Sequence, residues 1–120
     1  MRVGEIWTYN AIKPNNNETK IRPVLIIGTD EANRLNFIDI NYVIISSSAQ
    51  CGKYDIQINN EEAKKIGLAR SSVIKTTKIY TGSQSKLGIK IGELPNELKK
   101  EFISKYTNYQ RNLINNLKLS

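Results

Sequence analysis

Two stretches of sequence decide the fold: GEIWTYN at residues 4–10 and RPVLII at residues 22–27. The first alternates apolar and polar side chains, which is typical of a half-buried β-strand. The second is short and apolar, which indicates a central strand, and Pro23 is expected to open it. The polar residues 13–20 between them predict a loop. Arg22 therefore stands where a loop enters an apolar strand, and a permanent charge at that point needs a partner or a function.

The rest of the chain reads as further strands followed by one long helix. A short helical turn is expected from Asn59, with Gly67 stopping it. Apolar residues recur every three or four positions from Leu98 to Leu117, which predicts an amphipathic helix. The other segments with strand character are residues 36–47, 54–58, 72–75, 78–81 and 88–94. We therefore expect a single domain over residues 1–120, a β-rich α+β fold in which a small curled barrel carries the helix.

The charge balance favours a polyanionic partner. Eighteen Lys and Arg residues against eleven Asp and Glu residues give a net charge of +7. Such an excess points to nucleic acid before it points to a membrane. The longest apolar run, at residues 24–27, is far too short to cross a bilayer, and no signal peptide is visible. We expect a cytoplasmic protein.

The side chains available for chemistry are restricted. The sequence contains no histidine, which removes the imidazole pair of many ribonucleases and the common zinc sites. Cys51 is the one cysteine, so no internal disulfide forms, and without a histidine base it reads as a passive residue. Acid–base or electrostatic catalysis would have to use Arg, Lys, carboxylates or hydroxyls, and neither a metal nor a cofactor is expected.

Several short motifs, in the same order along the chain, resemble the MazF/PemK-type toxins of bacterial type II toxin–antitoxin systems. Each motif is loose by itself, but together they cover nearly the whole sequence. They are GEIW at residues 4–7, RPVLII at 22–27, VIISS at 43–47, GLARSSVI at 67–74 and IGELP at 91–95.

The resemblance implies a fold and an activity. The fold would be an SH3-like small β-barrel of the MazF/PemK/Kid type with a long C-terminal helix, forming a homodimer. The activity would be that of an mRNA interferase, which is a metal-independent endoribonuclease acting on single-stranded RNA. The partner would be a cognate protein antitoxin, expected to be acidic and partly disordered. In this family the catalytic pair is the arginine of the R-P strand, here Arg22, and a hydroxyl at the end of the third strand, here Ser46 or Ser47.

Other residues have open alternatives. Glu18 is a weaker catalytic candidate and reads more readily as a solvated charge. Arg22 could instead form a structural salt bridge with Glu18 or Asp30. Trp7 and Tyr9 could stack on bases but are expected in the core. Candidate phosphate contacts are Lys13, Lys20, Lys53, Arg70, Lys75 and Lys78.

The predicted chemistry suits a chain without histidine. The RNA 2′-OH attacks the adjacent phosphate and leaves a 2′,3′-cyclic phosphate, so neither a protein nucleophile nor a metal is required. The protein must orient that attack and neutralise charge on the phosphate, which a guanidinium does with two parallel hydrogen bonds. Two other readings remain: a catalytically silent SH3-like module that binds nucleic acid or protein, and a DNA-binding gyrase poison or repressor.

Overall fold

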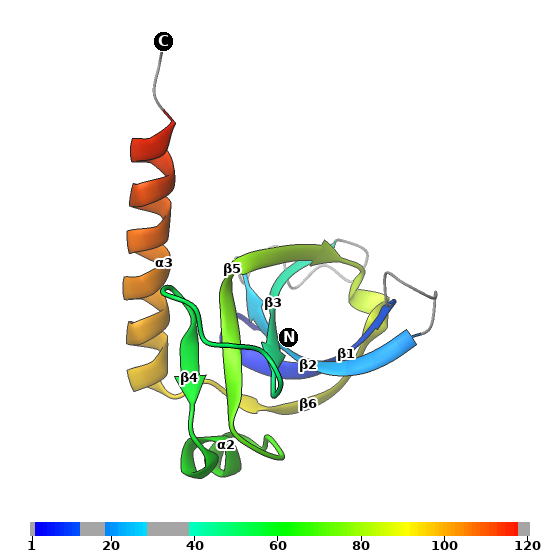
Figure 1. The fold of residues 1–120 in the computed structure, drawn as a ribbon. Coiled ribbons are helices and arrows are strands. Elements are labelled where there is room, and N and C mark those ends of the chain that lie inside the picture. The colour runs from blue at the N-terminus through cyan, green and yellow to red at the C-terminus, as the bar shows by residue number, and fades with distance from the viewer. Residues whose placement is uncertain (1, 13–18, 29–38, 118–120) are drawn as a thin grey trace.

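Six strands and two α-helices make up the fold of the computed structural model, which describes residues 2–12, 19–28 and 39–117 (Figure 1). The sheet has the order β4-β5-β3-β2-β1-β6, and every neighbouring pair is antiparallel. A short 3₁₀ turn, η1 (Gln84–Lys86), precedes the last strand. The strands are β1 (Glu5–Ile12), β2 (Thr19–Ile27), β3 (Ile40–Ser46), β4 (Ile56–Ile58), β5 (Ser72–Gly82) and β6 (Leu87–Glu93), and the helices are α2 (Asn60–Ile66) and α3 (Asn96–Asn116).

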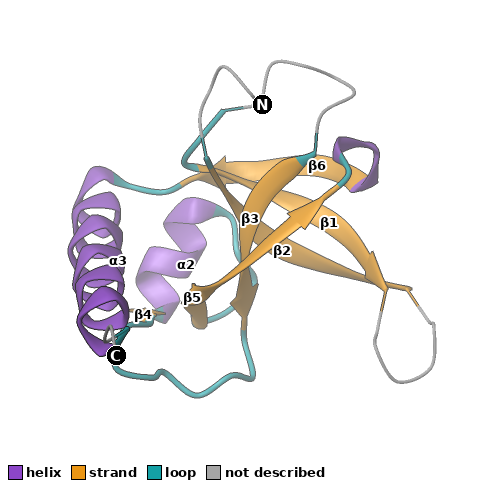
Figure 2. Ribbon diagram, turned by 90° about the horizontal axis from the view of Figure 1, so that it is seen from above, coloured by secondary structure: helices purple, strands orange, loops and turns teal. Residues whose placement is uncertain are grey.

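The sheet curls on itself, and both helices lie to one side of it (Figure 2). The predicted β-rich α+β architecture with a long C-terminal helix is therefore confirmed. One buried cluster packs between the sheet and the helices and includes Ile6, Leu25, Val43 and Leu98. A second cluster lies within the curl of the sheet, where Tyr9, Val24, Ile26, Ile40 and Tyr42 pack together.

The second strand is longer than the sequence predicted. It begins at Thr19, so Pro23 lies inside it and does not open it. Pro23 pairs with Thr8 of β1, whereas pairing with β3 begins only at Val24. One side of β2 thus has no strand partner at Pro23, and a residue without an N–H is tolerated there.

The two short strands predicted at residues 72–75 and 78–81 are one continuous strand, β5. Thr76, which lies between the two predicted segments, is fully buried, and its hydroxyl donates to the Ile74 carbonyl. β5 is continuous because it pairs with β4 at one end and with β3 along most of its length. In contrast, β3 and β4 are shorter than predicted, and residues 36–38 lie outside the described part of the chain.

Both helices follow their sequence signals. Asn59 caps α2 through a reciprocal pair of hydrogen bonds with Glu62, and Gly67 ends the helix at φ 106°, where a left-handed backbone favours glycine. The first turns of α3 pack on the sheet through Leu98 and Phe102, while its C-terminal end projects past the barrel with Leu117 exposed (Figure 1). Neither helix combines the length and apolar character needed to cross a bilayer, as far as the described residues go.

Candidate active site

The N-terminal half of β2 and the end of β3 meet at one edge of the sheet. The register pairs Val24 with Ile44, and the same register continued by two residues puts Arg22 opposite Ser46. Side chains two positions apart point to the same face of a strand, so Arg22 and Ser46 share a face with Val24 and Ile44. The two residues predicted as a catalytic pair therefore come from adjacent strands and lie on one side of the sheet.

A cleft of about 280 Å³ opens at this edge. Its polar lining comes from β2, the end of β3 and the segment before β5. Apolar side chains of the strand ends and of that segment complete its walls. The polar residues that line it are Lys20, Arg22, Ser46, Ser47, Ser48, Arg70 and Ser72.

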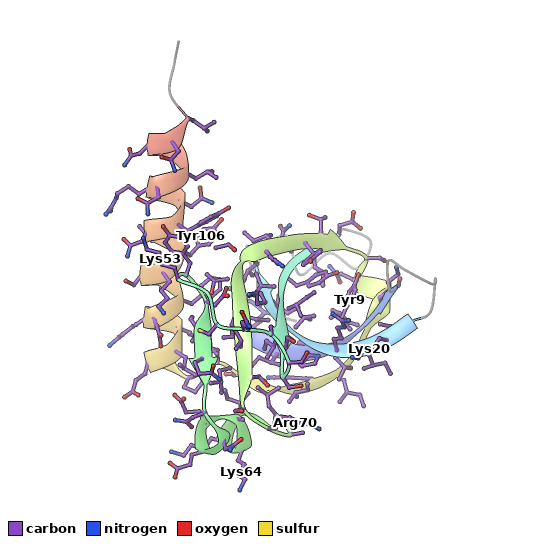
Figure 3. All side chains as sticks on the ribbon, in the orientation of Figure 1. Tyr9, Lys20, Lys53, Lys64, Arg70 and Tyr106 are labelled. Carbon is purple, nitrogen blue, oxygen red and sulfur yellow. The ribbon has the colours of Figure 1, made fainter. Side chains whose placement is uncertain are left out.

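The cleft brings three positively charged side chains together. Arg22 is half-buried, whereas Lys20 and Arg70 are exposed (Figure 3 labels both). None of these three cations has an ion-pair partner within residues 2–12, 19–28 and 39–117. The salt-bridge alternative for Arg22 involves Glu18 and Asp30, both of which lie outside the described residues. A guanidinium that has no carboxylate partner in the described part of the chain is suited to an anionic ligand.

The three consecutive serines differ in what they contact. The Ser46 Oγ accepts hydrogen bonds from the backbone amides of Ser48, at 3.3 Å, and Ala49, at 3.2 Å. Ser47 is exposed, and its hydroxyl has no hydrogen-bond partner among the described residues. The Ser46 Oγ also lies 3.4 Å from the Ser48 Oγ, where either hydroxyl can be the donor, so the Ser46 oxygen is held by the turn that follows it. Ser48, which sequence reasoning missed, also lines the cleft, and only its place in the serine run could have indicated it.

Three of the other candidate phosphate contacts, Lys53, Lys75 and Lys78, do not line the cleft. The exposed Lys53 sits over the ring of Tyr54, on the α3 side of the molecule (Figure 3). Lys75 forms an ion pair with Asp55 at 2.6 Å. Lys78 is exposed on β5. Lys13 and Glu18 lie outside the described residues. Of the six predicted cations, the structure thus brings Lys20 and Arg70 to the cleft.

The aromatic residues of β1 belong to the core. Tyr9 is buried, and the centroid of its ring lies 4.5 Å from that of Tyr42. Burial raises the pKa of both tyrosines, and it raises that of Tyr42 to about 12. Trp7 packs against the same cluster, and its indole N–H donates to Glu5. Burial would raise the pKa of Glu5, but hydrogen bonds from Lys90, the Arg2 amide and Trp7 outweigh it and lower that pKa to about 2. The core interpretation of Tyr9 is confirmed.

A larger hollow of about 740 Å³ lies between α3 and the sheet. Most of its walls are apolar, with Ile27, Phe102 and Ile103 among them. No serine or arginine is found among the described residues that line it. Its composition suits an apolar partner, although Lys99 and Tyr106 also line it, and Arg22 and Ser46 line the smaller cleft instead. Cys51 is exposed in the loop after β3, outside both hollows.

The comparison with protein families is decisive. The family model described as "PemK-like, MazF-like toxin of type II toxin-antitoxin system" matches residues 2–105. The chain belongs to this family. Among curated proteins no match was found. Residues 106–120, which include the projecting end of α3, lie beyond the matched region of this toxin.

Solved structures share the fold of this toxin. A mycobacterial endoribonuclease in complex with its cognate antitoxin superposes with a TM-score of 0.71 at 13% identity, covering 100% of this chain and 99% of that one. The Mycobacterium tuberculosis toxin MazF-mt6 gives 0.65 at 19% identity, covering 85% and 93%. Another mycobacterial endoribonuclease gives 0.68 at 14% identity, covering 90% and 88%. The curled barrel with its C-terminal helix is therefore the fold of MazF-like toxins.

Proposed function

We propose that this toxin is a metal-independent endoribonuclease that cleaves single-stranded RNA, with Arg22 and Ser46 as its catalytic groups. One observation supports this most directly: Arg22, which lacks an ion-pair partner among the described residues, and Ser46, whose hydroxyl oxygen is held by two backbone amides, line the same cleft. Family membership and the solved endoribonucleases of the same fold support the reaction class.

The cleft supplies the groups that the reaction needs. The RNA 2′-OH gives up its proton and its oxygen attacks phosphorus, the bond to the 5′-oxygen breaks, and the 5′-oxygen takes a proton from water. The products are a 2′,3′-cyclic phosphate and a 5′-hydroxyl. Arg22 donates two hydrogen bonds to non-bridging phosphate oxygens as negative charge grows there, and Ser46 donates a third. Lys20 and Arg70 hold flanking phosphates. Ser47 remains the alternative hydroxyl, and Glu18 remains a candidate base for the 2′-OH proton.

Cleavage of a single-stranded RNA in the presence of EDTA tests this function. The wild type should produce 2′,3′-cyclic phosphate ends. Arg22→Ala should lose about a hundredfold or more in rate, the usual cost of one electrostatic donor. Salt-sensitive binding that leaves the RNA intact would instead identify a silent nucleic-acid-binding module.

The same proposal includes the partners. A protein antitoxin that is acidic and partly disordered would cover the basic cleft, as charge complementarity favours. A second copy of this chain would cover the apolar hollow beside α3, where Val3, Ile79 and Ile103 are exposed. Sedimentation of the purified toxin measures its oligomeric state, and a monomer at micromolar concentration would contradict the homodimer. We place the activity in the cytoplasm, where its RNA substrate is.

A further inference from the structure

The loop at residues 47–55 connects the candidate active site to β4. Figure 1 shows it running from the end of β3 toward α3 before it turns into β4. Its first part holds the Ser46 hydroxyl, because the amides of Ser48 and Ala49 donate to the Ser46 Oγ. The position of these amides therefore decides where the Ser46 Oγ is held.

The far end of the loop is held by a largely buried ion pair. Asp55 Oδ2 accepts from Lys75 Nζ at 2.6 Å and from the Gly52 amide at 2.8 Å. The two side chains are 6% and 19% exposed, so water competes little with the pair. The register that joins Ile56 to Ile74 also puts Asp55 opposite Lys75 when continued by one residue. The ion pair thus extends the β4–β5 ladder into the loop.

Lys75 also reaches the first part of the loop. Its Nζ donates to the Gln50 carbonyl at 3.2 Å, and Gln50 directly follows Ala49, whose amide contacts Ser46. From the other side, Lys105 of α3 donates to the Asp55 carbonyl at 2.9 Å. A continuous series of contacts therefore connects Lys75, the loop backbone and the Ser46 hydroxyl.

We propose that Lys75 and Asp55 are positioning residues for catalysis, which fix the loop at residues 47–55 so that its amides hold the Ser46 Oγ in place at the cleft. This inference rests on the proposed function, in which Ser46 contacts the scissile phosphate. Lys75 acts through the loop because its ammonium group is committed to Asp55 and the Gln50 carbonyl. That role differs from the phosphate contact predicted for Lys75 from the sequence.

The two roles predict different kinetics. Loosening the loop misplaces a catalytic hydrogen bond, and a displacement of about 1 Å can cost about a hundredfold in rate. Lys75→Met should therefore lower kcat by about tenfold to about a hundredfold with little change in KM. Lys75→Arg should recover most of the activity, because it keeps the charge and the donors. Loss of a phosphate contact would instead raise KM and flatten the salt dependence of binding.

A matched control and a reporter exist in the chain itself. Lys90→Met breaks a comparably short ion pair, to Glu5 at 2.7 Å, on the β1–β6 side of the sheet. Cys51 is the one cysteine and lies in the loop, so a nitroxide attached there reports loop mobility in a separate, labelled sample. Kinetics on RNA in EDTA and the nitroxide spectrum are to be measured for the wild type, Lys75→Met, Lys75→Arg and Lys90→Met. Asp55→Asn replaces Lys75→Met if the latter does not fold.

The proposal expects that, among these variants, Lys75→Met alone lowers kcat and increases the mobility of the nitroxide. It is overturned if Lys75→Met matches Lys90→Met in kcat, if its loss is entirely in KM, or if the nitroxide spectrum does not change. A wild type that leaves RNA intact contradicts the proposed function instead, and the nitroxide result then still decides whether Lys75 holds the loop.

Discussion

The two ends of β2 differ in almost every property. In its N-terminal half, Ile21 is 69% exposed and Arg22 is half-buried with no ion-pair partner among the described residues. A few residues further on, Leu25 is 2% exposed and Ile26 is fully buried. The neighbouring strand repeats the contrast, since β3 runs from a buried apolar body to the serines. Under the proposed function, this toxin separates stability and chemistry along the same two strands, and substitutions at the two ends should have different consequences.

The largest effect on stability should come from the buried end. Leu25→Ala removes a side chain from the cluster under α3 and should cost about 2–5 kcal/mol in the free energy of unfolding. Ile21→Ala, in the exposed N-terminal half of the same strand, should change the free energy of unfolding by about 0.5 kcal/mol or less. Urea denaturation of both variants measures the difference. Equal losses would show that the N-terminal half of β2 contributes as much to stability as its buried C-terminal half.

At the end of β3, substitutions of the two candidate serines should differ in their effect on the cleavage rate. Ser46→Ala should lower the cleavage rate by about a hundredfold, because an oriented donor is lost, whereas Ser47→Ala should change it little. Ser46→Thr, which keeps the hydroxyl, should retain most of the activity. Single-turnover cleavage in EDTA measures all three. A greater loss in Ser47→Ala than in Ser46→Ala would move the working hydroxyl to Ser47.

The smallest effect concerns the Glu5–Lys90 pair, which should affect stability without affecting cleavage. The pKa of Glu5 is lowered from 4.5 to about 2, so its contribution to stability is present above pH 4.5 and is lost as the pH falls toward 2. Melting temperatures between pH 7 and pH 2 should therefore fall less in Glu5→Gln than in the wild type. Glu93→Gln, which removes the exposed partner of the same lysine, is the control. Identical pH profiles for Glu5→Gln and the wild type would contradict this account.

Sequence patterns predicted the local features of the fold. Asn59 and Gly67 bounded α2 because caps depend on neighbouring residues alone. In contrast, the run of β5 through Thr76 depends on pairing with two distant strands, and no local pattern contains that information. Pro23 was misplaced for the same reason, since whether a proline fits inside a strand depends on which neighbour is missing.

The site shows the same division. Arg22 and Ser46 could be selected from the sequence because family motifs carry them. Lys75 looked like any surface cation, because its partner Asp55 is twenty residues away along the chain. Only the register of β4 on β5 brings the two together. Likewise, the distinction between Ser46 and Ser47 required the loop backbone, whose amides contact only Ser46.

The most direct test of the central claim is the single-turnover rate of Arg22→Ala on a single-stranded RNA in EDTA, beside Arg70→Ala as the matched arginine of the same cleft. The account predicts that the cleavage rate of Arg22→Ala at saturating RNA is about a hundredfold or more below that of the wild type, while Arg70→Ala keeps the wild-type rate and binds RNA more weakly. Cleavage by Arg22→Ala at the wild-type rate would contradict it.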